Sequence, residues 1–261
     1  MLNHVTYIHP TSTQWVTFVH GAGGSYNTWF KQIKAFKTNF NVLLLDLRGH
    51  GNSEGSLTLK DVKYTFAFLA NDIISLLDYL KIAKSHFVGI SLGTIIVREL
   101  AQLHPQRVTS LVLAGAIMKL NLRSWLLVKL GNIFKFYLPY ISLYTFFAYI
   151  IMPRSNHKTS RDIFINEAKK LNQLEFIKWF SLASEVNPVL KMFRKTELPK
   201  PTLYILGDQD AMFLPEIKEL VKKQNRFSTL VIVKNCGHVV NLDSAYFFNQ
   251  TVVAFIHQHA V

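Results

Sequence analysis

The stretch "HFVGISLGTIIVREL", residues 86–100, holds a single serine between two glycines, where an apolar strand pattern gives way to an apolar helix pattern. Residues 89–93 read Gly-Ile-Ser-Leu-Gly and match the motif G-x-S-x-G. In that motif the serine occupies a strained turn between a strand and a helix, and the flanking glycines relieve crowding. An ordinary turn capped by a serine is the alternative interpretation. The strand before the motif and the helix after it make Ser91 a candidate nucleophile.

Short apolar runs alternate with amphipathic patterns along the rest of the chain. The runs are apolar on both faces, which is typical of strands covered by helices on each side. The alternation predicts an α/β fold with a doubly wound, mainly parallel sheet. The expected strands are residues 14–20, 41–47, 86–90, 110–116, 202–207 and 229–235, with 4–8 as an extra edge strand, and the expected helices are residues 26–37, 61–80, 92–104, 214–225 and 243–258.

One segment, residues 117–196, interrupts this alternation because it shows helical patterns and no strand pattern. We expect residues 1–116 and 197–261 to form the α/β core, with 117–196 inserted after the sixth strand as a helical cap, or lid. Residues 136–152 carry no charge and approach the lower limit of about 17 residues for a membrane span. Pro139 interrupts this run, and a span there would split the sheet, so no membrane span is expected.

The bulk composition is that of a globular protein, with 261 residues of which 49% are hydrophobic and 17% charged. The single cysteine, Cys236, excludes an internal disulfide, and the first residues do not resemble a signal peptide. We therefore expect a cytoplasmic protein. The net charge of +13 is compatible with nucleic acid, an anionic membrane or acidic substrates. Because no nucleic-acid-binding motif is present, nucleic acid is not expected as a partner, and no oligomeric state is predicted.

A nucleophilic serine needs a base and a residue that orients the base. Behind a G-x-S-x-G turn these partners follow in the order acid and then histidine, on loops at the carboxyl ends of later strands. Asp208 and Asp210 follow one expected strand, and His238 follows the last. A loop histidine and helix-capping aspartates are the alternatives. The order and the positions favour a catalytic triad of Ser91, one of these aspartates and His238.

Acyl transfer also needs N–H groups that stabilise the developing oxyanion. The turn at residues 89–93 supplies the backbone N–H of Leu92. A second donor is expected in the glycine-rich loop 20–24, where Ala22 is the candidate, although a merely flexible turn is the alternative. No cofactor is required, and the sequence shows no Cys/His cluster that predicts a metal site.

The sequence resembles the α/β-hydrolase fold superfamily, in the group of small capped serine esterases and lipases. The resemblance implies that Asp210, the last residue of the family's G-x-x-D pattern, is the triad acid, and it supports Ala22 and Leu92 as oxyanion-hole donors. It also implies a mainly structural role for the loop 46–53. The matching stretches are "VHGAGGS" (19–25), "DLRGHGNS" (46–53), "GISLGT" (89–94), "PTLYILGDQD" (201–210) and "CGHVVNLD...FFNQTVVAFI" (236–256).

These features predict a serine hydrolase that cleaves carboxylic esters with hydrophobic acyl chains through an acyl-serine intermediate. One alternative keeps the triad for another reaction, such as thioester hydrolysis, C–C bond hydrolysis, perhydrolysis or an elimination. A ligand-binding receptor of the same fold and a membrane-associated scaffold are two interpretations without catalysis. The expected partner is a small hydrophobic ester.

The first helix of the expected cap is basic and amphipathic. Residues 116–198 hold thirteen Lys and Arg against five Asp and Glu. A helix of this kind can lie on an anionic membrane surface. We favour the simpler expectation that it packs on the core with its lysines in water. On a helical wheel one side holds Asn121, Ser124, Lys129, Asn132 and Lys135, and the other holds Leu122, Leu126, Leu130, Ile133, Phe134 and Tyr137.

Overall fold

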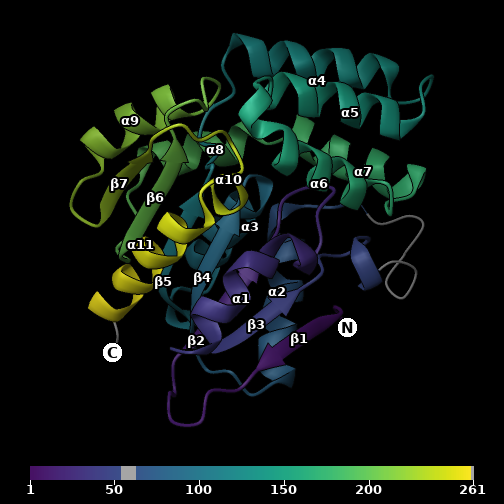
Figure 1. Ribbon diagram of the computed structural model, residues 1–261. Coiled ribbons are helices and arrows are strands. Elements are labelled where there is room, and N and C mark those ends of the chain that lie inside the picture. Colours follow the sequence, from purple (N-terminus) through teal and green to yellow (C-terminus); the bar gives the residue numbers. More distant parts are fainter. Residues whose placement is uncertain (54–62, 260–261) are drawn as a thin grey trace.

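The computed structural model describes residues 1–53 and 63–259, in which seven strands form one sheet (Figure 1). The strand order is β1-β3-β2-β4-β5-β6-β7, and every neighbouring pair is parallel except β1 and β3. The predicted doubly wound, mainly parallel sheet is therefore confirmed. The strands are β1 (His4–Tyr7), β2 (Trp15–Val19), β3 (Asn41–Leu45), β4 (Ser85–Ile90), β5 (Val108–Ala114), β6 (Thr202–Gly207) and β7 (Ser228–Val233).

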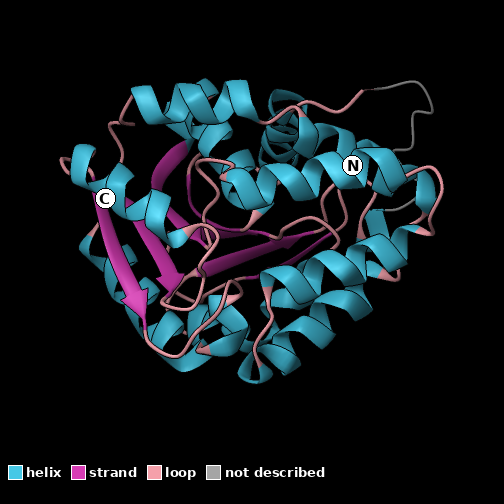
Figure 2. Cartoon of the chain, turned by 90° about the horizontal axis from the view of Figure 1, so that it is seen from above, coloured by secondary structure: helices cyan, strands magenta, loops and turns pink. Residues whose placement is uncertain are grey.

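Helices cover both faces of this sheet (Figure 2). Alternate side chains of a strand point to opposite faces, so each strand contributes to two cores. In β3, Leu43 and Leu45 belong to the core that includes α2 and α3, whereas Val42 and Leu44 belong to the core that includes α1 and α11. The covering helices are α1 (Phe30–Lys37), α2 (Phe66–Tyr79), α3 (Leu92–Leu103), α9 (Leu214–Lys223), α10 (Val240–Asp243) and α11 (Ala245–Gln258).

Two expected helices begin at least four residues later than the sequence pattern predicts. Residues 26–29 form a 3₁₀ turn before α1 begins. The helix expected over residues 61–80 begins at Phe66, because the Thr65 hydroxyl accepts the N–H of Phe68 and caps the first turn. The first two residues of that expected helix, 61 and 62, lie outside the described residues.

Five helices lie between β5 and β6 in the chain, and α4–α7 gather at one end of the sheet (Figure 1). In the described part of the chain, the strands β1 to β5 precede these helices. The helices therefore follow the fifth strand, and not the sixth as was expected. Within residues 1–53 and 63–259, no helix combines the length and the apolar character needed to cross a bilayer. The five are α4 (Leu122–Phe134), α5 (Tyr140–Ile151), α6 (Lys158–Ala168), α7 (Gln173–Ser184) and α8 (Asn187–Lys195).

Helix α4 leaves in water the side that the helical wheel marks as apolar, contrary to the favoured expectation, while Ser124, Leu127 and Val128 face the cavity described below. Ser124 and Lys135 are buried, whereas the side chain of Leu122 is 79% exposed and that of Ile133 is 52% exposed. Inward hydrogen bonds account for this orientation, because the ammonium group of Lys135 donates to the Ser181 hydroxyl on α7 and a buried polar group needs a partner.

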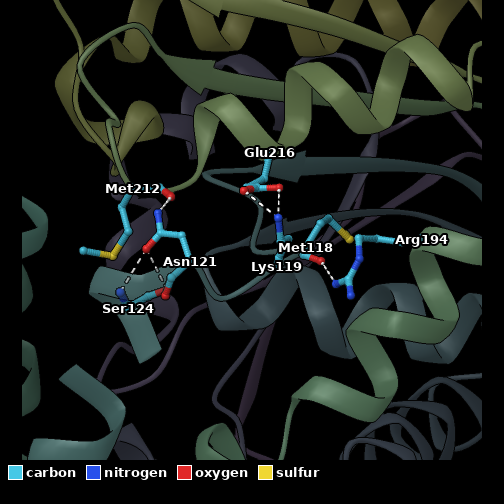
Figure 3. Close-up of polar contacts among 7 residues, drawn as sticks. All are labelled: Met118, Lys119, Asn121, Ser124, Arg194, Met212 and Glu216. Carbon is cyan, nitrogen blue, oxygen red and sulfur yellow. Dashed lines mark hydrogen bonds and ion pairs between the residues drawn. The ribbon is translucent and has the colours of Figure 1, made fainter. Parts of the chain in front are cut away.

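The start of α4 is anchored in the same way (Figure 3). The side chain of Asn121 donates to the carbonyl of Met212 at 2.7 Å and accepts the N–H of Ser124 at 3.0 Å. Just before it, Lys119 pairs with Glu216 on α9 at 3.0 Å. These contacts tie α4 to the segment that follows β6.

Candidate active site

The nucleophile candidate, Ser91, occupies a strained turn between β4 and α3. Its backbone angles are φ 52° and ψ −123°, a region that residues with a side chain rarely adopt. Its N–H is held by the carbonyl of Ala114 on the neighbouring strand at 3.0 Å. The turn places the hydroxyl beyond the carboxyl end of β4, where the strand and the helix meet.

The two glycines of the motif permit this close meeting. A Cβ atom on Gly89 would lie 2.9 Å from the carbonyl oxygen of Gly93. A Cβ atom on Gly93 would lie 2.5 Å from the carbonyl oxygens of Val19 and His20, at the end of β2. Both distances are shorter than real contacts, so any larger residue would force the helix away from the sheet.

The three residues of the predicted triad lie in one hydrogen-bonded chain. The Ser91 hydroxyl is 2.9 Å from Nε2 of His238, and Nδ1 of His238 is 2.7 Å from Oδ2 of Asp210. Asp210 and His238 are both buried. Asp208, the other candidate acid, is exposed, and its Oδ1 accepts the N–H of Cys236 instead. The geometry therefore brings Asp210, and not Asp208, to the histidine.

The loops after β6 and β7 approach closely enough to form this chain. A Cβ atom on Gly207 would lie only 2.0 Å from the carbonyl oxygen of Cys236, so the end of β6 admits the β7 loop only because residue 207 is a glycine. The Oδ1 of Asp210 accepts the N–H of Phe213 at 3.2 Å, which fixes the carboxylate. The Cys236 thiol is buried, and burial raises its pKa, so it is not the reactive group of this site.

The loop after β2 is held through the peptide group between Ala22 and Gly23. The phenol of Tyr144, on α5, donates to the carbonyl of Ala22 at 2.8 Å. On the other side, the N–H of Gly23 donates to Nε2 of His50 at 2.8 Å. Among the contacts of the described residues, the N–H of Ala22 has no protein partner. Leu92 is the first residue of α3, and the first N–H groups of a helix have no partner within it.

His50 must be neutral for this arrangement. Its Nδ1 donates to the carbonyl of Arg48 at 3.1 Å, which leaves Nε2 free to accept from Gly23. Burial lowers its pKa to about 3. The neighbouring ring of His20, 5.1 Å away between centroids, is also buried, and burial lowers its pKa to about 4. The loop expected to be mainly structural thus contributes His50, which positions the Ala22–Gly23 peptide.

Two further contacts to this loop were not foreseen from the sequence. Tyr144 is one, and Glu167 on α6 is the other, since its Oε2 accepts a hydrogen bond from the Ser25 hydroxyl at 2.6 Å. Both residues lie more than 120 positions along the chain from the loop, within segments that read as helical and carry no recognisable motif. No sequence pattern could have assigned them to the site.

A large apolar cavity lies above Ser91 and contains about 1080 Å³ of empty space, including its mouth. The described residues that line it include none with a charge, and most of them are aliphatic or aromatic. Leu92, Met212 and Phe213 come from the core, and side chains of α4, α5, α6 and α7 complete the wall.

Metal-binding side chains do not gather here. Within the described chain, no group of three or more His, Cys, Asp or Glu side chains is placed to hold a metal ion.

Comparisons with known proteins agree with this fold. A family model described as the alpha/beta hydrolase fold matches residues 14–140. The enol-lactonase from Burkholderia xenovorans LB400 has a similar structure, with a TM-score of 0.80 at 21% identity, over 98% of this chain and 96% of that chain. The chain has the fold of the α/β-hydrolase superfamily.

Two similar sequences have specific names. The dihydrolipoyllysine-residue acetyltransferase component of an acetoin cleaving system, from Pseudomonas putida, is 28% identical over 252 residues. The putative carbamate hydrolase RutD of Variovorax paradoxus (strain S110) is 35% identical over 116 residues, or 44% of this chain. The alignment with the first covers 94% of this chain, but the chain spans only 64% of the length of that relative and 42% of the length of the second.

Proposed function

We propose that this protein is a serine hydrolase that cleaves carboxylic esters with hydrophobic acyl chains. One observation carries the proposal: the hydrogen-bonded chain from Ser91 through His238 to Asp210 lies at the floor of a cavity lined by apolar side chains. The chain can activate the hydroxyl, and the cavity can bind an alkyl chain by removing it from water. Two similar proteins are named as hydrolases of a carbamate and an enol-lactone, both of which are acyl compounds.

In the first half of the reaction, the Ser91 oxygen attacks the ester carbonyl while its proton passes to Nε2 of His238. The N–H groups of Ala22 and Leu92 donate hydrogen bonds to the carbonyl oxygen and stabilise the negative charge that develops on it. Asp210 holds the proton of Nδ1 and stabilises the imidazolium that forms. His238 then gives the proton from Nε2 to the departing alcohol, and the acyl group stays on Ser91.

In the second half, a water molecule takes the place of the alcohol. His238 removes a proton from it as it attacks the acyl carbonyl, and the same N–H groups hold the oxyanion again. Collapse of this intermediate releases the acid and returns the proton to Ser91. Each step uses side chains and backbone groups of this chain.

The test combines covalent labelling with a chain-length series. A fluorophosphonate should add once to the wild-type protein, as seen in the intact mass, and not to Ser91→Ala. Turnover of p-nitrophenyl esters from acetate to palmitate should rise to a maximum beyond acetate, because longer chains bury more surface in the cavity. In Ala183→Phe, which fills part of the cavity wall on α7, the maximum should move to shorter chains.

Each outcome decides the proposal. A wild-type protein that takes no adduct and cleaves no ester would show that Ser91 is not a nucleophile, as expected of a ligand-binding receptor. An adduct with turnover restricted to acetate would retain the serine hydrolase and reject the hydrophobic acyl substrate.

Tyr144 provides a test of the oxyanion loop. Tyr144→Phe leaves the ring in place but removes the donor to the carbonyl of Ala22. The loss of a partner for a buried acceptor costs about 1–3 kcal/mol. Because the freed peptide no longer fixes the N–H of Ala22, we expect kcat to fall about tenfold with KM nearly unchanged, measured on a soluble short-chain ester.

Tyr140→Phe is the matched control. Tyr140 lies one turn earlier on α5, and its phenol donates to the carbonyl of Lys169, away from Ser91. We expect kcat within a factor of about two of wild type for this control. Equal kcat values in the two variants would show that Tyr144 does not position the oxyanion donor.

A further inference from the structure

The outward side of α4 carries large apolar side chains along its length, with Arg123 and Lys129 among them. The side chains concerned recur at three- and four-residue spacing, which places them on one side of a helix. They are exposed although each is large. We call them, together with the exposed Phe146 and Tyr149 on α5, the α4–α5 face. Its members on α4 and the turn after it are Leu122 (79% exposed), Trp125 (45%), Leu126 (49%), Ile133 (52%), Phe136 (68%) and Tyr137 (81%).

This concentration is unlike the rest of the surface. Half of the large apolar side chains that are exposed in the described residues lie between 122 and 149. An amphipathic helix on a protein core usually buries its large apolar side chains, whereas α4 turns Leu127 and Val128 toward the cavity and leaves Leu122, Leu126 and Ile133 in water. An exposed apolar surface of this extent is a contact surface for something else.

The charges around this face have one sign. Every charged residue between 117 and 161 is Lys or Arg. Arg123 and Lys129 lie exposed on α4, and the ammonium group of Lys129 sits 5.1 Å from the ring centre of Trp125. A second copy of the chain would bring equal charges together across the contact, which is unfavourable. An anionic bilayer supplies both the opposite charge and an apolar interior.

A second apolar cavity opens on the same face. It contains about 630 Å³ of empty space, and its lining includes Phe134 and Phe146, both partly exposed. Phe147 lines this cavity and also the cavity above Ser91. Gly131 allows the close packing of the wall between them, because a Cβ there would lie 2.2 Å from the ring of Phe180. One aromatic side chain thus borders both the surface cavity and the site.

We propose that the α4–α5 face docks on anionic lipid bilayers and that the hydrophobic ester is drawn from the bilayer through the second cavity, past Phe147. The docking follows from the exposed apolar side chains and the positive charge alone. The second part, the source of the substrate, rests on the proposed function.

Docking is tested with full-length Ser91→Ala protein, which cannot hydrolyse lipid. Vesicles of phosphatidylcholine with phosphatidylglycerol should bind it, vesicles of phosphatidylcholine alone should bind it less, and salt should weaken the difference. Binding should shift the fluorescence of Trp125 to shorter wavelength, because the indole leaves water. Trp29 and Trp179 are already buried and should not contribute.

The decisive variant carries Leu122→Glu and Leu126→Glu in addition to Ser91→Ala. Neither residue lines either cavity. In protein that retains Ser91, the two substitutions should therefore leave turnover of a soluble ester unchanged. Loss of two inserted leucines should lower the vesicle partition coefficient about 100-fold. The control, Tyr79→Glu, changes an equally exposed side chain at the end of α2, before β4, and should bind as Ser91→Ala does.

Three results would overturn the proposal: no binding of Ser91→Ala to anionic vesicles, equal binding by the double variant, or a wild-type dimer that the double variant converts to a monomer. None of them depends on hydrolysis. A failure of the labelling experiment at Ser91 would therefore reject the proposed function without deciding the docking.

Discussion

Asp210→Asn should lower kcat by about 10⁴-fold on any ester that the wild-type protein cleaves. The carboxylate accepts a hydrogen bond from the N–H at Nδ1 of His238, with 2.7 Å between Nδ1 and Oδ2. This leaves Nε2 unprotonated and able to take the proton of Ser91. An amide at this position presents an N–H to Nδ1, so the ring carries its proton on Nε2 instead. In that tautomer the histidine cannot act as the base. The measurement is kcat on a soluble p-nitrophenyl ester, with the thermal unfolding temperature recorded in parallel.

Asp208→Asn is the matched control, two residues away on the same loop. Its side chain is exposed, and its Oδ1 accepts the N–H of Cys236, a bond that an asparagine oxygen can also accept. We expect kcat within a factor of about two of wild type. If the large loss followed Asp208→Asn and not Asp210→Asn, the assignment of the acid would be wrong.

The free energy of unfolding should fall steeply as the pH drops from 6.5 to 4. Burial lowers the pKa of His20 and of His86 to about 4, and that of His50 to about 3. In this range the unfolded chain binds protons at these residues and the folded chain does not, so acid favours unfolding. Each of the three histidines lowers the free energy of unfolding by about 1.4 kcal/mol per pH unit, and the three together lower it by roughly 4 kcal/mol per pH unit. Typical stabilities are about 5–15 kcal/mol, so unfolding is expected within this window.

Urea unfolding at a series of pH values measures this slope. His86 lies away from Ser91 and contacts the Ser110 hydroxyl at 2.7 Å, so His86→Asn removes one of the three contributions and should reduce the slope by about a third. A free energy of unfolding that stays constant from pH 7 to about pH 4.5 would contradict the expected burial of neutral histidines.

The sheet and the positions of Ser91, Asp210 and His238 could be predicted because each follows a strand of a parallel sheet. The carboxyl ends of such strands meet at one edge, so order along the chain becomes proximity in space. The choice of Asp210 over Asp208 depended on the family resemblance, since both follow the same strand. The structure separates them by burial and by contact with the histidine.

Several features could not be predicted, for definite physical reasons. The helical wheel of α4 shows which residues share a side, but not which side faces the core. That was decided by partners from distant segments, such as Met212 and Ser181. The bond from Tyr144 to Ala22 joins residues 122 positions apart, and a tyrosine within an apolar run gives no signal of a long-range hydrogen bond.

That same bond has a mechanical consequence. Tyr144 belongs to α5, which lines the cavity, and Ala22 belongs to the loop that we propose stabilises the oxyanion. A displacement of α5 by about 1 Å would break the bond. The helix therefore cannot move away from the cavity and hold the Ala22 loop in place at the same time. If α5 moved away to admit substrate, it would have to return before the bond could be cleaved. This movement would then limit the rate of turnover. An acyl chain that enters past Phe147 leaves the hydrogen bond between Tyr144 and Ala22 intact, so it reaches a site that is already assembled.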